Sequence, residues 1–390
     1  MPPDHVPDQL TDGASERVSD RLHAWVEIDL GALVRNARRI AARAGVPVLP
    51  MIKADAYGLG AVRVARALEI VHPWGYGVAT VEEGAELRRA GITRPILLAT
   101  PLLPVGIEAA HAARLTPGLG DPDVIEAWVA ATGNAPWHLA IDTGMSRNGI
   151  RWDAVGEIGP LLRRAPPAGA YTHFLAAEAD DASVASQTAR FTAAVGALPA
   201  RPPILHAENS AAVERLSGTS SWSLVRPGIV LYGVGTRERD IADGPEPVVA
   251  LHARVVEVRT IRAGETVSYG GSFRAAGPMR IATVAAGYAD GYRRAFSNVG
   301  QAIIQGRRTR VVGIVTMDMT MLDVSDVACA VGDVVTLLGT PPAEGRAAGR
   351  GVAAGIDIRA AARAAGLLPY EVLTGLRHRL RRVYLDPPPG

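Results

Sequence analysis

Short apolar segments alternate with amphipathic segments through the first half of this 390-residue chain. Between residues 46 and 226, eight segments of strand length are separated by stretches with the apolar spacing of helices. Repeated β–α units predict a parallel sheet, and eight of them predict a closed (β/α)8 barrel of the TIM type. The predicted strands are residues 46–52, 76–80, 95–100, 115–119, 137–142, 169–173, 203–206 and 223–226. Helices are expected over residues 30–44, 81–90, 122–132, 153–164 and 182–198.

A different pattern follows residue 232, where prolines at 245 and 247 mark a linker. Alternating polar and apolar residues then predict a mostly antiparallel β domain, which ends in a helical tail over residues 359–382. The expected domains are a barrel over residues 21–249 and a β domain over residues 250–390. A disordered tail is expected over residues 1–20, which are rich in Asp, Pro and Ser. The β strands are expected at 251–261, 280–285, 301–304, 309–315, 320–324 and 333–338.

Composition excludes several classes of protein. The net charge of +2 gives no strong case for binding nucleic acid or membranes. No apolar run approaches transmembrane length, and the first twenty residues lack the apolar core of a signal peptide, so a cytoplasmic location is expected. Cys329 is the only cysteine, which excludes an internal disulfide and a cysteine zinc site. No metal is expected.

Unusual polar residues fall at the ends of five of the predicted barrel strands. Each group has an ordinary explanation: Lys53 could reach solvent, His173 could be a satisfied core histidine, and Asn209 could cap a helix. Because active sites of barrels lie at the carboxyl ends of the strands, five such ends together favour a functional site. The groups are Lys53, residues 142–147, residues 171–173, residues 206–210 and residues 226–229.

The last two strand ends predict an anion site. Ser210 offers a hydroxyl at a helix start, and Gly228 and Ile229 offer unobstructed backbone N–H groups. A lysine that is partly neutral can form a Schiff base with an aldehyde. A phosphate site with Lys53 across the barrel mouth therefore predicts pyridoxal phosphate as the cofactor.

These residues make the chain recognisable, because it resembles bacterial alanine racemases, which have the type III fold of pyridoxal-phosphate enzymes. The resemblance runs from about residue 25 to residue 384 and is specific because many motifs occur in one order. They are Lys53-Ala-Asp-Ala-Tyr-Gly58, Asp142-Thr-Gly-Met-Ser-Arg147, Thr172-His-Phe174, Asn209-Ser210, Val225-Arg-Pro-Gly-Ile229, Leu231-Tyr-Gly233, Val267-Ser-Tyr-Gly270, Gly287-Tyr-Ala-Asp-Gly291, Met317-Asp318 and Tyr370-Glu-Val372.

The resemblance implies a role for each site residue. Lys53 would carry the cofactor and act as one base, and Tyr288 would be the second base, contributed by the partner in a head-to-tail homodimer with shared active sites. Arg226 would face the pyridine nitrogen, with His173 between it and Tyr288. Arg147 and the backbone at Met317 would hold the carboxylate of L- or D-alanine. The remaining cofactor-binding residues would be Tyr57, Asn209, Ser210, Gly228, Ile229 and Tyr370.

The chemistry of racemisation agrees with these roles. A base is needed on each side of the α-carbon, and a tyrosine base near neutral pH needs cationic neighbours, which Arg226 and His173 could supply. Arginine does not give up its proton to the pyridine ring, so the ring stays a weak electron sink and side reactions are limited.

Two positions depart from the family pattern. Ala140 stands where the family often has a carbamylated lysine bonded to the substrate-binding arginine, so an anion such as chloride, a water or another side chain is expected beside Arg147. Thr316 stands where a cysteine is common, and it places a hydroxyl near the substrate.

The leading hypothesis is an alanine racemase that supplies D-alanine for peptidoglycan. A racemase for serine or several small amino acids is the alternative in the same class, although Tyr370 should crowd the side-chain pocket. A non-catalytic pyridoxal-phosphate-binding protein would resemble a lone barrel, so the β domain argues against it. A type III decarboxylase lacks support because Cys329 lies in no recognisable motif.

Overall fold

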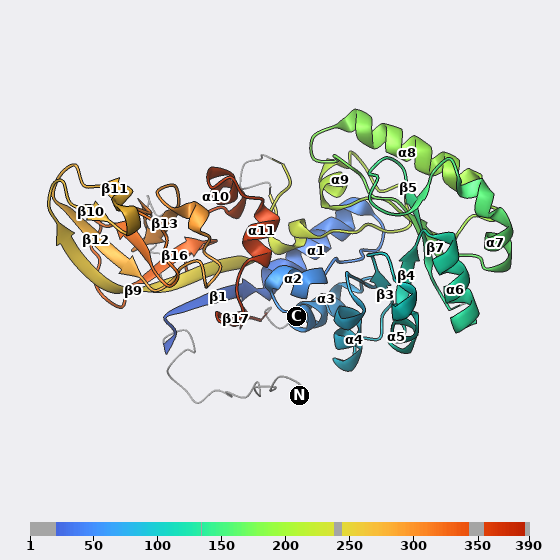
Figure 1. Ribbon diagram of the computed structural model, residues 1–390, viewed down its shortest axis with the longest axis horizontal. Coiled ribbons are helices and arrows are strands. Elements are labelled where there is room, and N and C mark those ends of the chain that lie inside the picture. Colours follow the sequence, from blue (N-terminus) through green and yellow to red (C-terminus); the bar gives the residue numbers. More distant parts are fainter. Residues whose placement is uncertain (1–20, 134, 238–243, 343–354, 387–390) are drawn as a thin grey trace.

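The computed structural model describes residues 21–133, 135–237, 244–342 and 355–386, so the tail expected over residues 1–20 lies outside it. A barrel lobe and a β lobe lie side by side along the long axis of the molecule (Figure 1). This arrangement confirms the predicted fold class, a (β/α)8 barrel followed by a mostly antiparallel β domain. No helix in the described ranges is both long and apolar enough to cross a bilayer.

Parallel strands form the barrel wall in chain order. They are β2 (Tyr76–Val78), β3 (Ile96–Leu98), β4 (Thr116–Leu119), β5 (His138–Asp142), β7 (Gly169–Tyr171) and β8 (Ile204–His206), and the short β6 (Ile150–Arg151) pairs only with β5.

Two segments without regular strand structure, residues 46–52 and 223–226, close the barrel. Residues 46–52 bridge to Gly77 on one side through Met51 and to Val225 on the other through Val48. The Leu49 amide donates to the Val225 carbonyl at 2.8 Å, and the Arg226 amide donates to the Glu208 carbonyl at 2.8 Å. Pro47 and Pro50 have no N–H to donate, which explains why the first strand pairs through single bridges rather than a continuous ladder.

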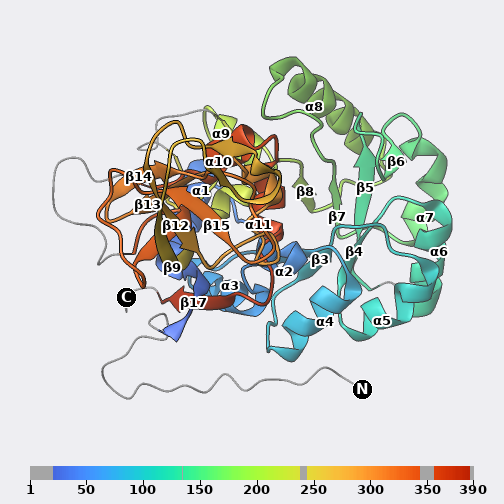
Figure 2. The same cartoon turned by 60° about the vertical axis from the view of Figure 1, so that its left-hand side comes forward.

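Helices cover the outside of this wall (Figure 2). The Asp29 carboxylate accepts the Ala32 amide at the start of α1, and Gly45 ends α1 in the left-handed conformation, so α1 has the predicted bounds. The predicted helix over residues 153–164 is instead a short 3-10 turn, η4 (Val155–Ile158), followed by α7 with Pro160 in its first turn. The described helices of the barrel are α1 (Leu30–Ala44), α2 (Lys53–Gly58), α3 (Ala61–Leu68), α4 (Val81–Arg89), α5 (Ile107–Ala112), α6 (Pro122–Thr132), α7 (Gly159–Arg164), α8 (Asp181–Gly196) and α9 (Ser210–Arg215).

The long strand β9 (Val249–Ile261) organises the β lobe by pairing with β1, β12 and β16. Although β1 (Ala24–Asp29) precedes the barrel in the chain, it lies in this sheet between β9 and β17. The other strands are β10 (Thr266–Val267), β11 (Phe273–Arg274), β12 (Met279–Val284), β13 (Gln301–Ile304), β14 (Arg307–Arg310), β15 (Thr320–Asp323), β16 (Val334–Leu338) and β17 (Arg381–Leu385).

The structure corrects two expected elements of this lobe. The strand expected over residues 309–315 is β14, which is shorter and ends before Gly313, where φ is +80°. The expected helical tail consists of α10 (Ile358–Ala364) and α11 (Pro369–Thr374), and the chain then extends as β17 in parallel pairing with β1.

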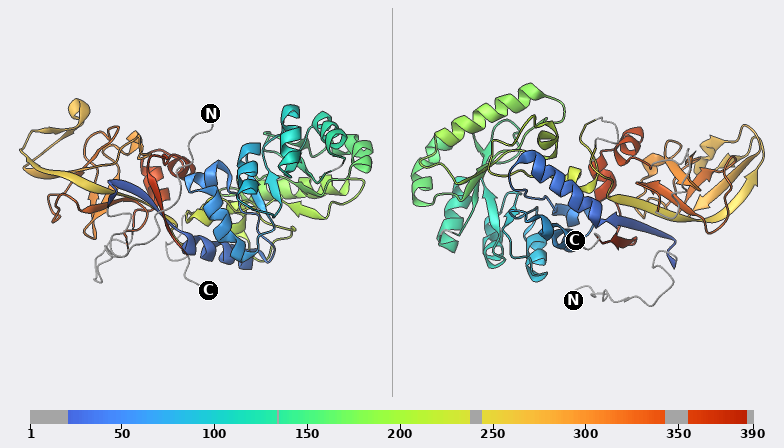
Figure 3. Two further views of the ribbon diagram at one scale, coloured as in Figure 1. Left: turned by 90° about the horizontal axis from the view of Figure 1, so that it is seen from below. Right: turned by 180° about the vertical axis from the view of Figure 1, so that it is seen from behind.

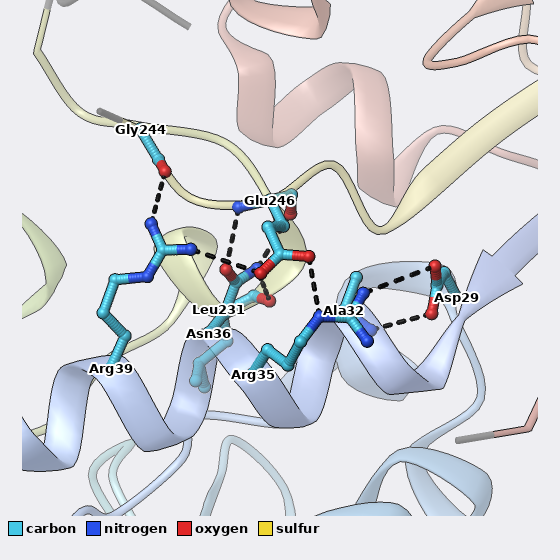
Figure 4. A network of polar contacts seen from close by, with 8 residues as sticks. All are labelled: Asp29, Ala32, Arg35, Asn36, Arg39, Leu231, Gly244 and Glu246. Carbon is cyan, nitrogen blue, oxygen red and sulfur yellow. Dashed lines mark hydrogen bonds and ion pairs between the residues drawn. The ribbon is translucent and has the colours of Figure 1, made fainter. Parts of the chain in front are cut away.

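A polar network attaches both ends of the linker, at Leu231 and Glu246, to α1 (Figure 4). Asn36 is buried, and its amide donates to the carbonyls of Leu231 at 3.2 Å and Glu246 at 2.8 Å. Arg35 pairs with the Glu246 carboxylate at 2.7 Å. These bonds fix the backbone where the chain leaves the barrel, so the chain enters β9 in a defined direction. Figure 3 shows α1 beside this passage when the molecule is seen from behind.

Candidate active site

A cavity of about 730 Å³ opens at the carboxyl ends of the barrel strands. The β lobe contributes to its lining through residues of α10 and α11, including Arg359 and Tyr370. Ten residues predicted from the sequence line it: Lys53, Tyr57, Arg147, His173, Asn209, Ser210, Arg226, Gly228, Ile229 and Tyr370.

Lys53 reaches the cavity from the start of a left-handed turn. The four residues after it, Ala54 to Tyr57, all have φ between +52° and +59°, so α2 winds through left-handed backbone. The turn is held by Glu83, which accepts the Ala54 amide at 2.6 Å, and by Asp55, which accepts the Ala61 amide at 2.7 Å. Left-handed backbone costs about 1–2 kcal/mol per non-glycine residue, and such strain concentrates at functional sites.

The surroundings of Lys53 lower the pKa of its amine, which lies in the cavity with one side open to solvent. Burial lowers the pKa of Lys53, the nearby Arg147 lowers it further, and Glu83 opposes the shift. Lys53 is also the only lysine in the chain, since every other residue of the Lys and Arg total is arginine. A neutral amine is the form that attacks a carbonyl group.

Across the mouth, Gly228 and Ser210 form a cradle that could hold a small anion. The Gly228 amide donates to the Ser210 hydroxyl oxygen at 2.8 Å. A side chain at position 228 would collide with the Tyr57 hydroxyl, so only glycine leaves this space open. Burial raises the pKa values of Tyr57 and Tyr370, which keeps both phenols protonated as donors. Asn209 is also the N-cap of α9, accepting the Ala212 amide at 3.1 Å.

Arg226 is 5% exposed and reaches the floor of the cavity with several bonds already made. Its guanidinium donates to the carbonyls of Thr172 at 2.7 Å and Ala207 at 3.0 Å, and it lies 3.4 Å from Nδ1 of His173. Burial lowers the pKa of Arg226 to about 10, so it stays a cation near neutral pH. Burial and Arg226 together lower the pKa of His173 to about 3, so His173 is neutral and Arg226 alone carries the charge of this pair.

A chain of hydrogen bonds runs from Arg226 into the barrel core and has only one possible polarity. Arg226 can only donate, so Nδ1 of His206, at 2.8 Å, must accept. Burial lowers the pKa of His206 well below its usual value, so the ring is neutral and carries its proton on Nε2. That proton is donated to Nδ1 of His138 at 2.8 Å, which leaves the His138 proton on its own Nε2. The chain of donors therefore starts at Arg226 and ends at Nε2 of His138.

Arg147 lies at the cavity rim with no acidic side chain within salt-bridge distance in the part of the chain that the structure describes. Its loop is held by Asp142, whose carboxylate accepts the amides of Gly144 and Met145 at 2.9 Å each. Behind the loop, Ala140 is buried in β5 beside a void of about 10 Å³ that Tyr171 and Asn148 also line. A void of this size fits about one water.

Tyr288 and Met317, also predicted from the sequence, do not line the cavity. They lie together in the β lobe, where the Tyr288 amide donates to the Thr316 carbonyl at 3.0 Å and the Ala289 amide to the Met317 carbonyl at 2.9 Å. Both side chains are open to solvent, at 39% for Tyr288 and 53% for Met317.

Tyr269, to which no role is assigned from the sequence, is 74% exposed near the same loops. It follows Ser268, whose φ of +66° with an extended ψ is strained for a serine. The Ser268 hydroxyl donates to the Ile314 carbonyl at 2.7 Å, which ties Tyr269 to the segment leading to Thr316 and Met317. The signal was present in the Val267-Ser-Tyr-Gly270 motif, which places a tyrosine in a turn between short strands.

Fold and site together define a barrel enzyme whose lysine lines one cavity with the Ser210–Gly228 cradle. The alanine racemase N-terminal domain matches residues 28–236 and the alanine racemase C-terminal domain matches residues 248–384. The chain belongs to the alanine racemase family.

Relatives match over almost their whole length. The alanine racemase of Citrifermentans bemidjiense is 37% identical over 92% of this chain and 98% of its own, and that of Synechocystis is 38% identical over 94% and 100%. Alanine racemase from Streptomyces coelicolor superposes with a TM-score of 0.84 at 30% identity, covering 95% of this chain and 100% of its own. The Bartonella henselae enzyme, solved with covalently bound pyridoxal phosphate, superposes with a TM-score of 0.83 at 28% identity, covering 93% and 100%.

Proposed function

We propose that this protein interconverts L-alanine and D-alanine with pyridoxal phosphate bound to Lys53. The observation that carries the proposal is the placement of the chain's only lysine opposite the Ser210–Gly228 cradle, at the mouth of a barrel of this family. The peptidoglycan precursor pool is the proposed destination of the D-alanine, and the cytoplasm is the proposed location.

The residues fit this cofactor. Ser210, the amides of Gly228 and Ile229, and the hydroxyls of Tyr57 and Tyr370 would hold the phosphate, while Asn209 and His173 would line the ring. Arg226 would face the ring nitrogen as a donor, because a guanidinium has no acceptor atom. When bound, the cofactor supplies an electron sink that acidifies the α-hydrogen of an amino acid.

Racemisation requires a proton to leave one face of the α-carbon and another to arrive on the opposite face. Lys53 would serve one face. The other would be served by a tyrosine from the β lobe of a head-to-tail partner, either Tyr288 as predicted from the sequence or Tyr269. The exposure of both tyrosines and of Met317, outside their own chain's cavity, supports a shared site. Arg147 and the Met317 backbone would hold the carboxylate.

Alanine is favoured over serine by the surroundings of Thr316. Its hydroxyl donates to the Met319 carbonyl at 3.0 Å and accepts the Met319 amide at 3.2 Å, so it is already engaged within its own turn. Its only donor hydrogen is therefore used, so a substrate hydroxyl could meet it only through its one remaining lone pair. The ratio of kcat/KM values for alanine and serine tests this preference.

The single lysine allows a clean test of the cofactor site. Borohydride reduction of the protein incubated with pyridoxal phosphate should abolish its near-visible absorption and leave the reduced adduct on the peptide that contains Lys53. Lys53→Ala should lack the adduct and racemisation in both directions, and Lys53→Arg, which keeps the charge, should be equally inactive. Normal turnover by Lys53→Ala would contradict the proposal.

A further inference from the structure

Arg379 bridges two loops of the β lobe through their carboxylates. Its Nε donates to Oδ1 of Asp290 at 2.6 Å, and its Nη2 donates to Oδ2 of Asp290 at 3.1 Å and to Oδ1 of Asp318 at 2.7 Å. Forked pairing of arginine with a carboxylate fixes direction as well as distance, unlike most pairs at a surface.

Asp290 is the fixed point of this bridge because it is 4% exposed. Oδ2 of Asp290 also accepts the Gly287 amide at 2.9 Å, and its backbone carbonyl accepts the Arg377 amide at 3.0 Å. A buried carboxylate needs a cation and hydrogen bonds to remain charged. Arg379 supplies the cation, while the backbone bond holds the loop against the segment that follows α11.

The two bridged loops carry residues that the proposed function assigns to the partner's site. Residues 287–291 contain Tyr288, and residues 316–318 contain Met317. Backbone bonds from Tyr288 to Thr316 and from Ala289 to Met317 join the loops at one end. Arg379 joins them again one residue further along, because Asp290 directly follows Ala289 and Asp318 directly follows Met317.

We propose that Arg379 is a positioning residue for the half-site that each subunit contributes to its partner. It acts through Asp290 and Asp318 by fixing the spacing of Tyr288 and the Met317 backbone, which would contact the substrate. The proposal rests on the shared site put forward above. It assigns Arg379 to the donated half-site and not to the barrel of its own chain.

The consequence is a loss of substrate binding with the cofactor site intact. Arg379→Gln should lower kcat/KM for alanine by about 10²-fold, the scale expected when a substrate-positioning group shifts by about 1 Å. The loss should appear mainly in KM, while the absorption spectrum and cofactor affinity stay at wild-type values. Asp318→Ala should act in the same direction and leaves the buried Asp290 paired. Arg379→Lys, which keeps charge but not the fork, should fall between wild type and Arg379→Gln.

Arg381→Gln is the matched control. Arg381 is exposed and pairs with Trp25 through the backbone of β17, so its side chain should be dispensable for kcat/KM.

Mixed dimers separate a positioning role from general destabilisation. When Arg379→Gln is mixed with Lys53→Ala, one site in each hybrid combines an intact barrel with intact donated loops, so kcat/KM should recover. When Arg379→Gln is mixed with a tyrosine→Phe subunit that is inactive through its donated half, neither site is intact, so no recovery is expected. The reference pair is Lys53→Ala with that tyrosine variant.

Recovery in the reference pair but not with Arg379→Gln and Lys53→Ala would overturn the assignment of Arg379 and leave the shared site standing. Absence of recovery in the reference pair, once subunit exchange is confirmed, would overturn the shared site and the inference with it. Wild-type kcat/KM for both Arg379→Gln and Asp318→Ala would also overturn the inference.

Discussion

Two tyrosines flank the segment of residues 313–317, and each could serve as the second base. Tyr288 lies in a tight turn bonded to Thr316, beside Met317. Tyr269 is far more exposed than Tyr288 and follows a strained serine. Neither feature stabilises the fold of a single chain. Strain held by the surrounding structure is a mark of functional positions. These observations favour Tyr269 as the base and Tyr288 as a substrate contact.

Paired Tyr269→Phe and Tyr288→Phe variants separate these roles. Loss of a positioned base costs at least ~10²-fold, so Tyr269→Phe should lower solvent-deuterium exchange by that factor from one enantiomer, expected to be L-alanine. Tyr288→Phe should mainly raise KM. Both should retain the spectrum of the lysine-bound cofactor. The reverse result would assign the base to Tyr288, and equal losses for both enantiomers would contradict a two-base mechanism.

Much of the candidate site could be predicted residue by residue. The type of each side chain and its position at the end of a predicted strand can both be read from the sequence. Lys53 and Arg226 are examples. The protonation of His206 and His138 was not predictable, since their contact exists only after β5 and β8 are brought together in the barrel wall. His173 shows the same limit, because its neutral state results from burial beside Arg226.

Among the elements, α2 departs most from ordinary backbone. Its left-handed residues turn the chain sharply after Lys53 and place Tyr57 against the Gly228 cradle. The β lobe supports the turn from outside: Arg382 donates to the Gly58 carbonyl at 2.9 Å, and the Tyr384 hydroxyl donates to the Leu59 carbonyl at 2.9 Å. The strain is thus balanced by contacts from the last strand of the chain.

Substitution of Ala54 tests this strain. Ala54 is exposed and has a φ of +53°, which glycine adopts without steric cost. Ala54→Gly should therefore raise the free energy of unfolding by up to about 1 kcal/mol, whereas Ala54→Val should lower it. Ala42→Gly, at an exposed site of the right-handed α1, should lower it by about 1 kcal/mol. Equal signs for the two glycine substitutions, measured by denaturant unfolding, would contradict a strained α2.

Most elements follow from local spacing, but those defined by distant partners do not. The alternation predicts α1 and α6 closely because apolar period and capping residues are local signals. The helical tail expected over residues 359–382 overlaps the start of β17 (Arg381–Leu385), which is extended because it pairs with β1 at the opposite end of the chain. No local pattern records such a contact.

At the scale of the molecule, the two lobes are joined by β1, which leaves the β sheet and leads directly into α1 of the barrel. We therefore propose a domain boundary near residue 249, with β1 assigned to the β domain because it lies in that sheet, although it precedes the barrel in the chain. The two lobes are also tied through Arg382 and Tyr384, which reach the turn after Lys53. Movement of the β lobe would consequently displace the turn that carries Lys53.

The cores of both lobes contain histidines that folding keeps neutral. His138 and His206 lie in the barrel and His252 in β9, all completely buried. Burial lowers the pKa of His138 to about 4 and that of His252 to about 3, and it lowers the pKa of His206 well below its usual value. In the unfolded chain each histidine returns to about 6.5. Below that pH the unfolded chain binds more protons, so the free energy of unfolding must fall as the pH falls.

The free energy of unfolding should fall between about pH 6.5 and about pH 4. Acidification from pH 7 to pH 5 should lower it by about 2 kcal/mol per histidine. His252→Gln removes one of these groups, so the stability advantage of the wild type over this variant should shrink by about 2 kcal/mol across that range. His378→Gln, at an exposed site, should leave the dependence unchanged. Denaturant unfolding of the cofactor-bound protein at one protein concentration, at pH 7, 6 and 5, measures the difference without a contribution from mass action. A wild type and a His252→Gln variant that lose stability in parallel would show that His252 is already protonated, or readily protonated, in the folded state.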